Sequence, residues 1–481
     1  MQVLERYSFH FNARRSVTDY KKDEEMERKS MQKCIKIISP CGILGYGFPK
    51  EPFLNAFHER IHGIVVDAGS TDAGPHKLGA NVSIVSRRAL KKDLSIILEK
   101  GLKHRIPVII GSAGGAGAKT HVELTLEIVK EILAEQKTHA KIGIIWADFK
   151  QQTIIDALEE GRITPLSPNI PSLTKEIILD TKTIVAQMGH EPILKALKQG
   201  CDIILCGRSY DPSPFAALGI YHGMDPGLAY HLGKILECGA LCAEPGTTKD
   251  SILGTLYEDC FTVQALNPIR KCTPTSVAAH TFYEKEHPFI LHGPGFTLNL
   301  ENCEFNEIAD GIIEVRNSRY IPDSEMKIKL EGARKVSYRT FVIAGIRDPL
   351  LIHQLEDIER KVLQQVKSYF TEIPDEDYEV NFYHYGQDAV LGEQEPTPLK
   401  GHEIGVMFEV LAKEQELANS ICANVRSTFL HYGYEGRKSS AGNLAFPFAP
   451  SDIEFGPVYE FSIYHLMHIT RDPFLLEVVE V

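Results

Sequence analysis

Short, nearly continuous apolar runs alternate with amphipathic segments through the first half of the chain. We expect six of these runs to be β-strands, at residues 34–41, 62–69, 106–111, 141–148, 183–189 and 201–207. The segments between them show the three-to-four-residue periodicity of helices, as over 86–103. Strands that are apolar on both faces and separated by helices are typical of a parallel sheet covered on both sides. The pattern therefore predicts an α/β fold with a mostly parallel, doubly wound, Rossmann-like sheet.

The pattern changes in the second half of the chain. From about residue 254 to 322 the segments are short, polar and strand-like, with turns between them. From residue 335 onward the order is strand, long helix, strand, strand, helix, strand. That order is typical of a ferredoxin-like α+β sandwich.

This change of pattern predicts the domain organisation. Residues 1–32 form a charged N-terminal arm that we expect to be flexible. Residues 33–325 form an α/β domain that carries the functional site, and residues 326–481 form a smaller ferredoxin-like α+β domain. An apolar, proline-punctuated loop at 443–452 is suited to closing over a site or sealing a subunit interface, and we expect a homo-oligomer.

Composition and charge exclude several classes of partner. The chain is 43% hydrophobic and 24% charged, which is typical of a globular protein, and its formal net charge is −12. No stretch gathers enough Lys and Arg to neutralise a row of phosphates, so we expect no nucleic-acid partner. No apolar run approaches the ~20 residues that span a bilayer, and the start of the chain lacks the apolar core of a secretory signal. We therefore expect a cytoplasmic protein with no membrane partner.

A glycine-rich turn follows the third expected strand, within 106–121 (IPVIIGSAGGAGAKTH). Gly114, Gly115 and Gly117 allow a backbone to wrap closely around an anion, and Ser112 adds a hydroxyl beside them. A helix begins directly afterwards, and its N-terminus favours negative charge. The turn is therefore expected to bind a carboxylate or another anion. The alternative is that the glycines only allow the strand and helix to pack tightly.

No nicotinamide or nucleotide signature is present. Lys119 follows the glycines as in a P-loop, but both glycine positions that the motif requires hold alanine, Ala113 and Ala118. An earlier Gly45-x-Gly47 has Lys50 at the third glycine position of the dinucleotide fingerprint. The cofactor therefore stays unknown, with a divalent metal as one option.

The loop after the second expected strand concentrates carboxylates and hydroxyls. It contains Asp67, Ser70, Thr71, Asp72 and His76. Two neighbouring carboxylates with a histidine can share a proton or hold a divalent cation. The alternative is that the carboxylates cap or turn the loop.

A third loop follows the strand at 201–207 and contains Arg208 and Asp211. Arg208 is suited to binding a substrate carboxylate or phosphate, with Asp211 holding the guanidinium in place. A structural Arg–Asp pair at the end of a strand is the alternative. The carboxyl ends of parallel strands share one edge, so Asp67, Ser112 and Arg208 are expected to meet there, with His121 one turn into the adjacent helix.

Seven motifs together resemble the acyclic terpene utilisation (AtuA) family. They are DAGSTDAGP, GSAGGAG, GRSYDP, ILECGALCAEPG, RKCTPTSVAAHTFYEKEHP, RSTFLHYGYEGR and AGNLAFPFAPSDI. The resemblance extends over nearly the whole chain after residue 33. It implies an α/β domain followed by a ferredoxin-fold domain, and a link to the breakdown of branched terpenoid acids as coenzyme A thioesters.

The leading functional hypothesis is an enzyme of carboxylic-acid catabolism, a lyase or hydratase acting on a small branched carboxylate or its acyl thioester. In this hypothesis the glycine turn with Ser70, Thr71, Ser112 and Arg208 binds the substrate. Asp67, Asp72, His121 and Asp211 then provide the catalytic groups. A metal-dependent hydrolase centred on the Asp67 loop and a non-catalytic binding or assembly subunit are the two alternatives.

Overall fold

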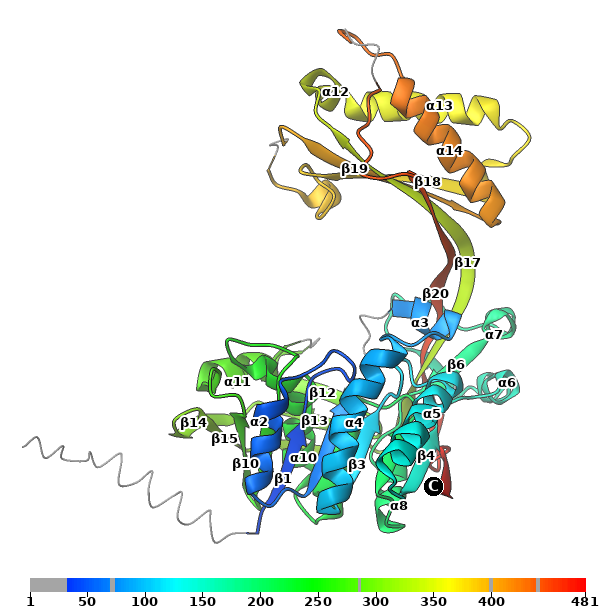
Figure 1. Cartoon of the computed structure of the whole chain (residues 1–481). Coiled ribbons are helices and arrows are strands. Elements are labelled where there is room, and N and C mark those ends of the chain that lie inside the picture. The colour runs from blue at the N-terminus through cyan, green and yellow to red at the C-terminus, as the bar shows by residue number, and fades with distance from the viewer. Residues whose placement is uncertain (1–32, 70–73, 284–286, 398–400, 438–441) are drawn as a thin grey trace, which may run out of the picture. The chain divides into compact units, whose positions relative to one another are not determined.

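The computed structural model describes residues 33–69, 74–283, 287–397, 401–437 and 442–481 (Figure 1). The chain divides into two compact units. The first comprises the chain up to Ala333 together with Phe461–Val481, and the second is Arg334–Glu460. The expected N-terminal arm, residues 1–32, lies outside the described residues.

A ten-stranded mixed sheet forms the centre of the first unit, in the order β14-β15-β10-β9-β1-β2-β3-β7-β4-β21. Its parallel core consists of β1 (Ile35–Ser39), β2 (Gly63–Asp67), β3 (Val108–Gly111), β7 (Ile203–Cys206) and β4 (Lys141–Trp146). Every residue of β2, β3 and β7 is buried, as expected for strands covered on both faces. The α/β class expected from the sequence is confirmed.

The expectation of a mostly parallel sheet is wrong, because antiparallel strands extend the core on both sides. They are β9 (Ile252–Leu256), β10 (Cys260–Ala265), β15 (Ile312–Arg316), β14 (Glu304–Ala309) and, at the other edge, β21 (Leu475–Glu480). Short turns join β9 to β10 and β14 to β15, and short connections allow only antiparallel pairing. Four of the short strands in this part of the described chain, β9, β10, β14 and β15, therefore join the main sheet.

The residues of β2 alternate between two apolar layers. Ile64 and Val66 pack into one layer, which also contains residues of α4 (Arg87–His104) and α5 (Lys119–Gln136). Val65 packs into the layer on the other face, with residues of the helices that follow β7. Helices therefore cover both faces of the parallel core (Figure 1).

The remaining helices of the first unit are α2 (Lys50–Asn55), α3 (Gly74–Ala80), α6 (Gln151–Glu159), α7 (Lys175–Asp180), α8 (Glu191–Lys198), α9 (Ser213–Tyr221), α10 (Pro226–Leu236) and α11 (Pro274–Thr281). Most of α9 is buried, and so is α10 from Gly227 onward, which explains why their sequences are largely apolar. Within the described residues, no helix has the length and apolar character needed to cross a membrane.

Smaller sheets complete the first unit. One pairs β8 (Ala243–Glu244) with β11 (Lys271–Cys272), and another contains β12 (Ile290–Gly293), β13 (Phe296–Asn299) and β16 (Arg319–Pro322). The expected strand at 183–189 is β6 (Thr183–Ala186), and it pairs antiparallel with β17 (Met326–Ile346) instead of joining the main sheet. Strand β5 (Ile163–Pro165) pairs antiparallel with β20 (Asp452–Ile469).

In its described residues, the second unit contains an antiparallel sheet and three α-helices. Its strands are parts of β17 and β20, with β18 (Tyr378–Tyr385) and β19 (Ile404–Ala412), in the order β18-β19-β17-β20. Its helices are α12 (Pro349–His353), α13 (Leu355–Tyr369) and α14 (Gln415–His431). Apolar residues of α13 and α14 pack against β17, β18 and β19 in a separate core.

Candidate active site

The carboxyl ends of β2, β3 and β7 meet at one edge of the main sheet. The three strands are parallel neighbours, so the residues that follow them are adjacent. The backbone N–H of Ala68 donates to the carbonyl of Gly111 at 2.9 Å, which joins the first two loops. The Ser112 hydroxyl lies 3.1 Å from a guanidinium nitrogen of Arg208, which joins the second loop to the third. Asp67, Ser112, Arg208 and Asp211 therefore gather at this edge.

Arg208 is buried, and its guanidinium donates to several acceptors. Nη1 donates to Oδ1 of Asp211 at 2.9 Å, to the Ser112 hydroxyl at 3.1 Å and to its neighbour's carbonyl at 3.0 Å. Nε donates to Oε2 of Glu331 at 2.8 Å. Burial alone would lower the pKa of Arg208, but Glu331 and Asp211 raise it above its ordinary value. The Arg–Asp pair is thus present, and the guanidinium is fixed by bonds within the protein.

Glu331, on β17, is the carboxylate that anchors this arrangement. Besides Arg208, it accepts a hydrogen bond from Nε2 of Gln187 at 2.9 Å and lies 3.2 Å from Nζ of Lys329. Burial would raise the pKa of Glu331, but Arg208 and Lys329 outweigh burial and lower it to about 2. Glu331 is therefore ionised at neutral pH.

Asp67 is the last residue of β2 and is only 3% exposed. Its Oδ1 has no hydrogen-bond partner among the described residues. Burial raises the pKa of this carboxyl well above its ordinary value, and the negative charges of Asp211 and Glu237 add to the rise. The backbone N–H of Gly69 and the charge of Arg208 act in the opposite direction. Burial beside other carboxylates favours the protonated form of Asp67.

A buried charged pair at the C-terminal end of α10 interacts electrostatically with Asp67 and Asp211. Nζ of Lys234 is 2.7 Å from Oε1 of Glu237, and both side chains are less than a tenth exposed. Burial would lower the pKa of Lys234, but Glu237 raises it well above its ordinary value. Asp67 and Glu237 interact electrostatically, and so do Lys234 and Asp211.

The buried cations of this region already have carboxylate partners. Arg208 is paired with Glu331 and Asp211, and Lys234 is paired with Glu237. Asp67 has no ion-pair partner of its own within the described part of the chain. An ionised Asp67 would place an unpaired negative charge in the interior, which is the physical reason for its raised pKa.

The backbone of the glycine turn makes most of its hydrogen bonds inside the protein. Ser112 has a φ of +43°, and its N–H donates to the Ser209 hydroxyl at 3.1 Å. The N–H groups of Gly115 and Gly117 donate to carbonyls within the turn. Gly117 has a φ of +61°, and a Cβ there would lie 2.2 Å from the backbone nitrogen of Arg208. A Cβ on Gly114 would lie 2.6 Å from that of His121, so these glycines allow close approach between segments.

His121 lies in the first turn of α5 and is 1% exposed. Its Nδ1 accepts a hydrogen bond from the backbone N–H of Ala116 at 3.3 Å, and its Nε2 has no partner among the residues that the structure describes. Burial lowers the pKa of His121 to about 4, with a smaller effect from Lys77. The imidazole is therefore neutral at pH 7, and its acceptor Nδ1 places the proton on Nε2.

Three of the sequence-predicted residues, Ser70, Thr71 and Asp72, lie outside the described residues. His76 lies on α3. Within the described ranges, no group of three or more His, Cys, Asp or Glu side chains is placed to hold a metal ion.

Sequence reasoning missed Lys234, Glu237 and Glu331. For the first two a signal existed, because they interrupt an otherwise apolar helical stretch (LAYHLGKILECGALC) three residues apart. Charged residues in such a stretch are buried only when they are paired. Glu331 gave no such signal, because Lys327 and Lys329 precede it at two-residue spacing and suggest a solvent-exposed face.

Residues 86–257 match the family model described as "Acyclic terpene utilisation family protein AtuA". The matched segment includes the glycine turn, Arg208, Asp211 and the Lys234–Glu237 pair, whereas Asp67 and Glu331 lie outside it. The comparisons with curated proteins and with solved structures found no significant match. The resemblance expected from the motifs is therefore confirmed over residues 86–257.

Proposed function

We propose that the carboxyl edge of β2, β3 and β7 is the active site of a lyase or hydratase that acts on a small branched carboxylate or its acyl thioester. The observation that carries this proposal is the buried Asp67 carboxyl, whose Oδ1 has no partner among the described residues. A carboxyl group whose pKa is raised by burial is suited to proton transfer near neutral pH. The family description, acyclic terpene utilisation, supports a branched acyl substrate.

In this proposal Asp67 acts as the proton donor. Hydration of a double bond next to a carbonyl adds a proton to the α-carbon and a hydroxyl from water to the β-carbon. Asp67 gives its proton to the α-carbon, and the attacking water then returns a proton to the Asp67 carboxylate, so the acid is regenerated. The reverse sequence of steps removes water. Asp211, whose side chain is 32% exposed, is suited to contacting the substrate or the water.

Arg208 acts in this proposal as a positioning residue. Its guanidinium is fixed by Glu331, Asp211 and Ser112, so it orients Asp211 and supplies a positive field at the edge of the sheet. The glycine turn brings the loops close enough for this contact. His121, neutral at pH 7, provides an N–H donor beside the turn.

The second unit is proposed to have a ferredoxin-like arrangement, as expected from the sequence. Its element order of strand, helices, strand, strand, helix, strand supports this proposal, together with the strand order β18-β19-β17-β20.

The experiment that tests the function is a ligand screen followed by a turnover assay on the full-length protein. 3-Methylbut-2-enoate and its coenzyme A thioester represent the proposed substrate class, and ATP and saturated straight-chain acids are the comparison ligands. We expect the branched unsaturated compounds to raise the melting temperature. We also expect turnover, followed by loss of the conjugated double bond's ultraviolet absorbance, and we expect Asp67→Asn to abolish it.

Asp93→Asn is the matched control. Asp93 is also 3% exposed, but its Oδ2 accepts hydrogen bonds from the N–H groups of Gly45 and Gly47 at 2.9 and 3.0 Å. We expect this variant to lose stability and keep its turnover per folded molecule. Unchanged turnover in Asp67→Asn would remove Asp67 from the mechanism. Stabilisation by a divalent cation, with no response to any acyl compound, would favour a metal-dependent hydrolase instead.

A further inference from the structure

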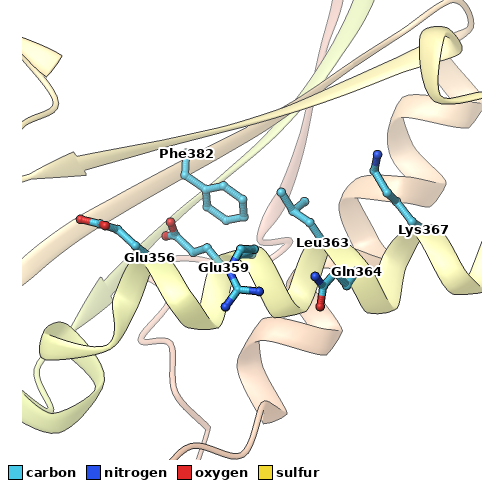
Figure 2. A pocket seen from close by; sticks show the side chains of 7 residues that line it. Glu356, Glu359, Leu363, Gln364, Lys367 and Phe382 are labelled. Atoms are coloured by element: carbon cyan, nitrogen blue, oxygen red, sulfur yellow. The ribbon is translucent and has the colours of Figure 1, made fainter. Parts of the chain in front are cut away.

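The second unit has a shallow groove between α13 and strand β18, with a volume of about 430 Å³. The groove is lined by Glu356, Glu359, Arg360, Leu363, Gln364, Lys367 and Phe382. Figure 2 shows the side chains from α13 in a row, with Glu356 and Lys367 at opposite ends and Phe382 pointing from the strand toward the helix. This surface is separate from the candidate active site, which lies in the first unit.

The order of charges along α13 is self-complementary. Glu356, Arg360, Leu363 and Lys367 follow one another at spacings of four, three and four residues, so they form one stripe along the helix. The stripe begins with an acidic residue and ends with a basic one, roughly 16 Å further along the helix at 1.5 Å per residue. When two copies of this stripe lie antiparallel, Lys367 of one copy lies opposite Glu356 of the other. A second α13 running antiparallel would therefore match it at both ends.

Strand β18 lies at the edge of its sheet. It pairs with β19 from Tyr378 to Tyr385, and the described strands include none on its other side. An edge strand presents unpaired backbone N–H and C=O groups, which form a template for another strand. Two copies of one edge can pair antiparallel about a two-fold axis. The helices beside the two edges then also run antiparallel.

We propose that the groove between α13 and β18 is the contact surface for a second copy of this chain. The two copies are related by a two-fold axis, with Glu356 of each copy opposite Lys367 of the other. Leu363 and Phe382 lie near the middle of the contact, where they exclude water. Because the interface is isologous, each Glu–Lys contact occurs twice.

The ion-pair partner of Lys367 within the chain is easily exchanged. Lys367 lies 2.8 Å from Asp375, and the two side chains are 53% and 68% exposed. Exposed ion pairs contribute little stability, so replacing this pair by a contact with Glu356 of the second copy costs little. By contrast, Glu359 is buried and bonded to Nε2 of His384 at 2.8 Å, so it fixes the floor of the groove.

The test is the mass of the full-length protein in solution, measured by sedimentation at several concentrations and two salt concentrations. We expect twice the chain mass of 53.8 kDa at micromolar concentration. Glu356→Lys places like charges opposite each other at two points, and so does Lys367→Glu. We expect each variant to raise the dimer dissociation constant by ~10-fold or more. The double variant restores the opposite charges and should restore the dimer.

Glu416→Lys is the control, because it makes the same charge change at an exposed position near the start of α14. It should leave the dimer unchanged. The proposal is overturned if the wild-type chain is monomeric at all concentrations. It is also overturned if Glu416→Lys weakens the dimer as much as Glu356→Lys or Lys367→Glu does. A double variant that dissociates as readily as the single ones would overturn it as well. Turnover and ligand binding at the first unit are measured separately, so failure of one proposal is distinguishable from failure of the other.

Discussion

The guanidinium of Arg208 lies against the carboxylate of Glu331, with Nε 2.8 Å from Oε2, although 123 residues separate the two along the chain. The Arg208 side chain is 4% exposed and that of Glu331 is 7% exposed. A buried pair of this kind is costly to break, because the remaining charge loses its partner while it stays away from water. Strand β17 therefore fixes the loop that follows β7.

Glu331→Gln is expected to destabilise the protein strongly. The substitution leaves Arg208 with Asp211 as its carboxylate partner, and we expect the free energy of unfolding to fall by about 3 kcal/mol. Chemical denaturation followed by circular dichroism measures this change. Asp310→Asn is the comparison, because it removes an ion pair with Lys271 whose side chains are 59% and 78% exposed. That variant should change the stability by less than about 0.5 kcal/mol.

Gly117→Ala tests the close approach between the glycine turn and Arg208. The new Cβ would lie 2.2 Å from the backbone nitrogen of Arg208, so the loops must separate. We expect a loss of about 3 kcal/mol, made up of left-handed backbone strain and the steric clash. Gly161→Ala isolates the first contribution, because Gly161 has a φ of +69° and a Cβ there meets nothing within 4 Å. If both variants lost the same free energy of unfolding, the Cβ at residue 117 would fit without a steric clash.

The raised pKa of Asp67 predicts a pH-dependent effect of Asp67→Asn. Below the ordinary aspartate pKa of 3.8, the carboxyl is protonated in both the folded and the unfolded protein. Above it the unfolded chain ionises first while the folded protein keeps the proton, so wild-type stability falls as the pH rises. The neutral Asn variant lacks this loss. We expect its melting temperature to rise relative to wild type from about pH 4 toward neutral pH.

If the difference in melting temperature stayed constant with pH, Asp67 would have the same proton affinity in the folded and unfolded states. The role of Asp67 as an acid would then lose its basis.

His121 predicts an effect of the opposite sign. The pKa of His121 is about 4 in the folded protein, and that of an unburied histidine is 6.5. As the pH falls, the unfolded chain therefore takes up the proton first. The stability due to neutral His121 is complete above pH 6.5 and is lost between pH 6.5 and about 4. The total loss amounts to about 3 kcal/mol.

His121→Asn removes this titration and keeps a side-chain acceptor for the N–H of Ala116. Its unfolding free energy should therefore fall less steeply than that of wild type over the same pH range. Urea denaturation at several pH values measures the two slopes. Parallel curves for the two proteins would show that His121 titrates normally in the folded state.

The sequence by itself determined the local elements and the place where the loops meet. Continuous apolar runs such as that of β2 identify strands buried on both faces, and parallel strands place Asp67, Ser112 and Arg208 at one edge. These features depend on neighbouring residues and on the handedness of connections, so they can be predicted locally. The same reasoning missed β21, whose six residues follow a turn at the end of the chain and pair antiparallel with β4.

Only the tertiary structure decided which charges face one another. Glu331 reaches Arg208 because β17 pairs with β6, and Lys234 and Glu237 are buried because the end of α10 packs into the apolar core of the first unit. The pKa of Asp67 follows from the burial and the charges that these long-range contacts create. Electrostatic energy depends on distance and solvent access between residues remote in the chain, and neither quantity is present in the local pattern of the sequence.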